Sequence, residues 1–78
     1  MAVKEPLMRV KINGKQEEIQ EATLSDLLKA KNIEPQMVTV ELNSKMVDRS
    51  SLGSTRIQEG DEIEFLFFMG GGSETVYL

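Results

Sequence analysis

The chain has 78 residues, which fits one small domain, and it contains neither cysteine nor histidine. Disulfides and thiolate metal sites are therefore excluded, and the commonest general base is missing. Thirteen acidic residues against nine basic ones give a net charge of −4, which disfavours nucleic acid and suits a basic protein partner. No apolar run approaches the roughly 20 residues that cross a bilayer, and residues 1–10 lack the apolar segment of a signal peptide. We therefore expect a cytoplasmic protein that binds neither membranes nor nucleic acid.

The first predicted element is a β-hairpin. Apolar and basic side chains alternate along residues 8–12, which is typical of a half-buried strand. Asn13-Gly14 follows, and this pair favours a tight turn because both central residues need positive φ. Gln16–Gln20 is expected to return as the second strand, with Ile19 on the buried face.

The segment "ATLSDLLKAKNI" predicts a helix. Thr23 is a suitable N-cap, with Asp26 three residues further on. Asn32 can end the helix in a left-handed conformation, and Pro35 prevents its extension. The leucines lie at helical spacing and predict a buried stripe: Leu24, Leu27 and Leu28.

The second half of the chain predicts three more strands. "MVTVEL" alternates, Asn43-Ser44 is expected to turn into a very short strand at Lys45–Val47, and "EIEFLFF" is the longest strand. The loop between them is polar, with one helical turn expected around Ser50–Leu52, and residues 59–61 form the last turn.

This order predicts a two-layer α+β domain in which one helix covers one face of a mixed sheet of four to five strands. The domain is expected to span residues 1–69, followed by a flexible arm and tail at 70–78. The core is expected to hold Met8, Val10, Ile12, Ile19, Leu24, Leu27, Leu28, Val40, Leu42, Ile63, Phe65 and Phe67.

Polar clusters in the chain are interpreted as solvated surface. The carboxylates between Glu59 and Glu64 lack the spacing of a calcium loop, and Ser50-Ser51 has no histidine to activate it. We therefore predict no metal site and no catalytic residue of the protein's own.

The end of the last strand carries two features that suggest function. If Ile63, Phe65 and Phe67 fill the core, alternation turns Leu66 and Phe68 outward. An apolar patch with a polar rim marks a protein-binding surface, which is predicted here to comprise Leu66, Phe68 and Met69. The second feature is the glycine triplet Gly70, Gly71 and Gly72 directly after this strand.

The segments "KINGKQEEI", "ATLSDLLKAKNIEPQMVTVELNSKMVDRS" and "IQEGDEIEFLFFMGGG" together resemble the ThiS branch of the ThiS/MoaD family of sulfur-carrier proteins. These proteins are small ubiquitin-like β-grasp domains. The resemblance covers residues from about Met8 to Gly72. Each motif is weak alone, and their combination is specific.

The resemblance implies a carrier that is a substrate and not an enzyme. The carboxylate of Gly72 would be adenylated by an ATP-dependent ThiF-like enzyme and converted to a thiocarboxylate. The sulfur would then pass to an acceptor, commonly the thiazole of thiamine on thiazole synthase. Gly70 and Gly71 would form a thin arm that enters narrow active sites. The carrier itself would bind no cofactor.

The chain departs from this family by continuing from Ser73 to Leu78. With this tail attached, Gly72 has an amide carbonyl and no free carboxylate. One explanation is cleavage between Gly72 and Ser73 by a JAMM-type metalloprotease, as in some tailed sulfur carriers. The tail could also be an addition to the natural sequence. Loss of carrier function is a third explanation, with the tail serving as a ligand for strand addition.

Other functions remain open at this stage. Tailed carriers of this type also resemble those that serve cysteine, homocysteine or siderophore-type sulfur assembly. A ubiquitin-like modifier or a plain interaction module would share the fold. Binding that persists after Gly71→Ala and Gly72→Ala would indicate such a module.

Overall fold

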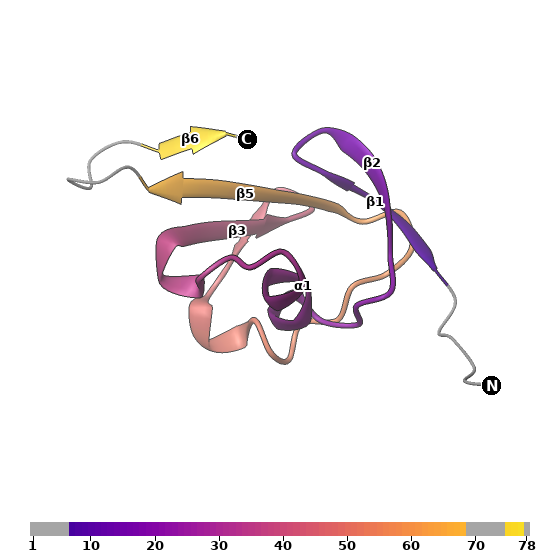
Figure 1. Ribbon diagram of the computed structural model, residues 1–78, viewed down its shortest axis with the longest axis horizontal. Coiled ribbons are helices and arrows are strands. Elements are labelled where there is room, and N and C mark those ends of the chain that lie inside the picture. Colours follow the sequence, from indigo (N-terminus) through magenta and orange to yellow (C-terminus); the bar gives the residue numbers. More distant parts are fainter. Residues whose placement is uncertain (1–6, 69–74, 78) are drawn as a thin grey trace.

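Two strands from opposite ends of the described chain lie side by side at the centre of the sheet. The computed structural model describes residues 7–68 and the short strand at 75–77 (Figure 1). Strand β1 (Met8–Ile12) pairs in parallel with β5 (Glu62–Phe68), through Lys11 opposite Glu62 and Ile12 opposite Ile63. The other strand pairs are antiparallel, so the sheet is mixed, as expected.

The remaining strands and the helix complete two layers. The sheet has the order β2-β1-β5-β3-β4, with β2 at Lys15–Ile19, β3 at Val38–Leu42 and β4 at Lys45–Val47. Helix α1 (Leu24–Ala30) lies across one face of the sheet (Figure 1). Short 3₁₀ turns at Pro35–Met37 and Arg49–Ser51 lead into β3 and follow β4. The predicted order of elements is confirmed. Within the described residues, no helix combines the length and apolar character needed to span a membrane.

Asn13 forms the first hairpin turn and also holds β5. Its φ is 50° and that of Gly14 is 84°, as the predicted turn requires. The backbone N–H of Asn13 donates to the carbonyl of Ile63 at 2.9 Å, and its side-chain Oδ1 accepts from the N–H of Phe65 at 2.8 Å. The returning strand begins at Lys15, one residue earlier than predicted.

Asn43 has the same two functions on the opposite edge of β5. Asn43 and Ser44 both have positive φ, at 52° and 72°, and they form the predicted turn into β4. The N–H of Asn43 donates to the carbonyl of Glu62 at 2.7 Å, and its Oδ1 accepts from the N–H of Glu62 at 2.9 Å. Two turn asparagines therefore hold β5 from both sides.

The helix has the predicted ends. The Thr23 side chain accepts a hydrogen bond from the N–H of Asp26 at 3.1 Å, which satisfies one of the free amides of the first turn. Asn32, with φ of 59°, lies just beyond the helix in the left-handed region. The leucine stripe Leu24, Leu27 and Leu28 is at most 1% exposed.

The core differs from the prediction in the loop between β4 and β5. Leu52 and Ile57 are each 5% exposed, although both were assigned to a polar loop. The N–H of Ile57 donates to the carbonyl of Ala22 at 2.8 Å, so this loop is fixed beneath the start of α1. Val38 also joins the core. Three residues predicted in the core are only partly buried against it: Met8, Leu42 and Phe67.

Strand β6 (Thr75–Tyr77) pairs antiparallel with the C-terminal half of β5. In Figure 1 it lies beside β5, and its arrow points toward the β1–β2 hairpin. The sequence analysis expected a flexible arm and tail at 70–78 and no strand there, whereas the structure has Thr75–Tyr77 in a strand. The physical reason is that β5 extends beyond the end of β1 and offers a free edge there. The predicted domain boundary at residues 69–70 lies outside the described residues.

Substitutions of Asn13 should separate its backbone and side-chain contributions. Asn13→Asp keeps an acceptor for the N–H of Phe65 and should lower the free energy of unfolding least. Asn13→Gly keeps the positive φ and loses the acceptor, which should lower the free energy of unfolding by about 1 kcal/mol. Asn13→Ala loses both the acceptor and the tolerance of positive φ, and it should lower the free energy of unfolding by about 1–2 kcal/mol. Urea unfolding measures the order Asp, Gly, Ala; equal stability of all three would contradict this role of Asn13.

Candidate functional site

The site predicted from the sequence is the C-terminal end of β5 and the arm that follows it. Leu66 and Phe68 belong to β5 and are described. Met69, the glycines Gly70, Gly71 and Gly72, and Ser73 at the predicted cleavage position lie outside the described residues. Their roles stay predictions.

Leu66 and Phe68 lie on the face of the sheet opposite α1, which we call the outer face. The pairing of β5 with β3 continues without interruption from Ile63 to Phe67, so the strand alternation is kept. Ile63 and Phe65 point into the core, at 1% and 2% exposure. Leu66 and Phe68 are half-buried on the other side, so they are less exposed than the sequence suggested.

Acidic side chains adjoin these apolar residues on the outer face. Glu64 of β5 lies directly opposite Glu41 of β3, and Leu66 lies opposite Thr39. Met46 of β4 lies opposite Glu41 and is 69% exposed. Like charges placed directly opposite each other in a sheet repel, so the pair of Glu41 and Glu64 destabilises the isolated protein. The outer face therefore offers a partner apolar contact next to negative charge.

A groove opens on the helix side of the same strand end. Its volume is ≈ 480 Å³. Its lining comes from β1, the first turn, the segment that follows α1, and β5: Ile12, Asn13, Lys31, Ile33, Phe65 and Phe67. The rings of Phe65 and Phe67 pack edge to face, with centroids 6.4 Å apart. No single segment of the sequence signals this groove, because its residues are brought together only by folding.

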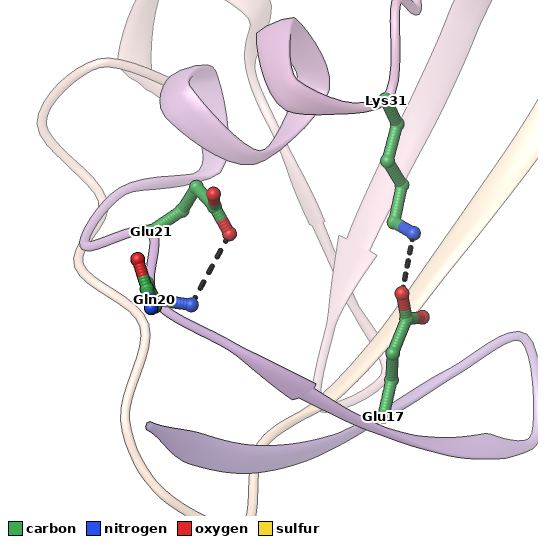
Figure 2. A network of polar contacts seen from close by, with 4 residues as sticks. All are labelled: Glu17, Gln20, Glu21 and Lys31. Carbon is green, nitrogen blue, oxygen red and sulfur yellow. Dashed lines mark hydrogen bonds and ion pairs between the residues drawn. The ribbon is translucent and has the colours of Figure 1, made fainter. Parts of the chain in front are cut away.

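Lys31 forms one wall of the groove and is held by an ion pair. Its Nζ lies 2.6 Å from Oε2 of Glu17 on β2 (Figure 2). Nearby, the backbone N–H of Gln20 donates to Oε1 of Glu21 at 3.3 Å. The ion pair joins the end of α1 to the first hairpin, and the partly exposed setting makes it worth about 0.5 kcal/mol.

The carboxylates and serines that were interpreted as solvated surface stay on the surface. Glu59, Glu62 and Glu64 are exposed, and so is Ser50. Among the residues that the structure describes, no group of three or more His, Cys, Asp or Glu side chains is placed to hold a metal ion.

A family comparison identifies the chain. The model of the ThiS family matches residues 10–72, from the first strand to the last glycine of the triplet. The chain belongs to the ThiS family. This confirms the family resemblance stated from the sequence motifs.

Solved structures agree with the ThiS assignment. A crystal structure of the thiamine biosynthesis protein ThiS from Geobacter metallireducens has a TM-score of 0.72 and 38% identity, covering 83% of this chain and all of that one. A solution structure of a thiamine biosynthesis protein from the same organism has a TM-score of 0.69 and 37% identity, covering 85% of this chain and 90% of that one. The predicted β-grasp fold is therefore confirmed.

Curated relatives are longer proteins. A thiazole synthase from Magnetococcus marinus is 36% identical over 66 residues, covering 83% of this chain and 20% of that protein. A thiazole synthase from Paramagnetospirillum magneticum is 32% identical over 68 residues, covering 86% of this chain and 21% of that protein. The ThiS-family chain described here spans about a fifth of the length of these relatives.

Reversing the charge of Glu64 should stabilise the isolated protein. Glu64→Lys replaces a repulsive cross-strand pair with an attractive one and should raise the free energy of unfolding by about 0.5 kcal/mol at low salt. Glu64→Gln should give an intermediate value. Denaturant unfolding of the three proteins measures the effect, and a Glu64→Lys protein less stable than the unchanged one would contradict the repulsion between Glu41 and Glu64.

Proposed function

We propose that this ThiS-family protein is a sulfur carrier of thiamine biosynthesis whose reactive terminus is Gly72. The observation that carries the proposal is the family match, which extends over the β-grasp domain and stops at Gly72. The solved relatives named as thiamine biosynthesis proteins support the pathway. The protein would act as a co-substrate and not as a catalyst.

The chemistry requires a free carboxylate at Gly72. A carboxylate is a poor acyl group until an ATP-dependent enzyme joins it to AMP and releases pyrophosphate. Hydrosulfide (HS⁻), supplied by a sulfur donor, then attacks the carbonyl carbon and displaces AMP, and the product is a thiocarboxylate. Glycine suits this position because it has no side chain to obstruct a narrow active site. A ThiF-like adenylating enzyme is the partner that this chemistry calls for.

The residues after Gly72 must be removed before this chemistry can begin. In the uncut chain the carbonyl of Gly72 belongs to the peptide bond with Ser73. Cleavage of this bond, by a protease such as a JAMM-type metalloprotease, would create the carboxylate. The uncut protein is then a precursor.

Thiazole synthase is the proposed acceptor enzyme. Two proteins with this name contain a segment similar to the chain as about a fifth of their length. A domain of this type is therefore joined to a thiazole synthase in one polypeptide in those organisms. Joining two proteins in one chain raises their effective concentration, which is useful when one must deliver a group to the other.

The outer face is the proposed docking surface for these enzymes. It combines half-buried Leu66 and Phe68 with the acidic residues Glu41 and Glu64, close to the start of the arm. Apolar contact supplies affinity, and the negative charge selects a partner with a basic surface.

Sulfur loading of the trimmed protein tests the proposal. A chain ending at Gly72, incubated with a ThiF-like enzyme, ATP and a sulfur source, should gain the mass of one sulfur atom in place of one oxygen atom. Intact-mass spectrometry measures the change. The uncut chain is the matched control and should gain nothing, because it has no carboxylate at Gly72.

Two outcomes would contradict the carrier function. One is a trimmed chain that stays unmodified although the same enzyme loads an established carrier. The other is an isopeptide conjugate to lysines in place of the thiocarboxylate, which would indicate a ubiquitin-like modifier.

A charge reversal tests the docking surface separately. In the trimmed chain, Glu64→Lys should slow loading about tenfold at low salt, and the difference should shrink above the physiological ionic strength. Glu34→Lys carries the same charge change at an exposed position outside the outer face and is the control. Equal rates for the two variants would contradict docking through the outer face.

A further inference from the structure

Strand β5 loses its parallel neighbour after its first two residues. Pairing with β1 ends at Ile12 opposite Ile63, where the chain turns away at Asn13-Gly14. The Asn13 side chain accepts from the N–H of Phe65 and thereby continues the pairing by one more step. Beyond Phe65, β1 offers no partner to this edge, although β5 runs on to Phe68. An unpaired strand edge is a template for any other extended chain.

Strand β6 occupies this edge. Its register places Tyr77 opposite Leu66, Val76 opposite Phe67 and Thr75 opposite Phe68. The segment that follows the predicted cleavage position therefore closes the edge that β1 leaves open.

The alternation of the backbone identifies Phe67 as the residue that faces β6. On the β1 side, the carbonyls of Asp61 and Ile63 accept from Lys11 and Asn13. On the β3 side, the carbonyl of Glu62 accepts from Asn43. The backbone N–H and C=O groups of successive residues in a strand point to opposite edges of that strand.

The N–H of Phe67 is therefore directed toward Val76, and that of Leu66 toward β3. By the same rule, the N–H of Val76 points toward β5, whereas that of Thr75 points away from it.

We propose that β6 is a removable cover of the β5 edge, which closes the uncut chain to strand addition at Phe67 and is lost on trimming. The inference rests on the proposed cleavage between Gly72 and Ser73. The only covalent link between β5 and β6 is the connection of residues 69–74, which contains that bond. After the cut, the attachment that the structure describes for the released segment is the pairing of its residues Thr75–Tyr77 with β5.

The cut should release the strand for a thermodynamic reason. A covalent connection gives the tail an effective concentration in the millimolar range, and cleavage removes this advantage. A strand of three residues is too short to stay paired without it. Trimming would thus produce two changes at once: a carboxylate at Gly72 and a free edge beside Leu66 and Phe68. The uncut precursor would have neither.

Amide hydrogen exchange, followed residue by residue by NMR, tests the cover without any enzyme. Four proteins are compared: the full chain, the chain ending at Gly72, and the full-length variants Val76→Pro and Thr75→Pro. The Phe67 amide should exchange at least about tenfold faster in the trimmed chain and in Val76→Pro than in the full chain. Thr75→Pro removes an N–H that does not face β5, so it should retain slow exchange at Phe67.

The Leu66 amide is the internal control, because it faces β3 and should exchange at the same rate in all four proteins. Equal exchange at Phe67 in the full and trimmed chains would overturn the proposal. Fast exchange at Phe67 in Thr75→Pro as well as in Val76→Pro would also overturn the assigned register. Because the measurement uses the purified chain alone, a failed sulfur-loading experiment leaves its result unaffected, and the reverse is also true.

Discussion

The fold depends on the attachment of β5 along both of its edges. Asn13 and Asn43 each form a hairpin turn with positive φ, and each also hydrogen-bonds to the backbone of β5 through its own N–H and its side-chain oxygen. Asparagine suits both tasks, since it tolerates the left-handed conformation and carries an acceptor on a short side chain. The two hairpins thus become the two neighbours of the last long strand.

The position of the site follows from this attachment. Because Ile63 and Phe65 are anchored in the core, alternation fixes Leu66 and Phe68 on the outer face. The predicted arm begins directly after these residues. Under the proposed function, a partner that recognises the outer face would be guided by β5 to the reactive terminus.

Local signals in the sequence were sufficient for most of the fold. The Asn13-Gly14 turn, the Thr23 cap and the alternation of β5 each depend on neighbouring residues, and each was predicted correctly. Leu52 and Ile57 were missed because a lone apolar residue in a polar loop has no periodicity.

The site was predictable to a lesser extent. The face on which Leu66 and Phe68 lie followed from the period of the strand, but their half-burial depends on the packed sheet. The helix-side groove and β6 depend on where β1 ends relative to β5, and this register is set by tertiary pairing.

The place where β1 ends also links the structure to the proposed chemistry. A longer β1 would pair with β5 as far as Phe68 and leave no edge for the tail. The turn at Asn13-Gly14 shortens β1 and leaves the final residues of β5 free for another strand. A tail that only blocked the carboxylate would need no defined structure. Pairing of Thr75–Tyr77 with this particular edge gives the tail a second effect, on the backbone beside the proposed docking residues. One hydrolysed peptide bond then suffices to alter both the reactive terminus and the surface next to it.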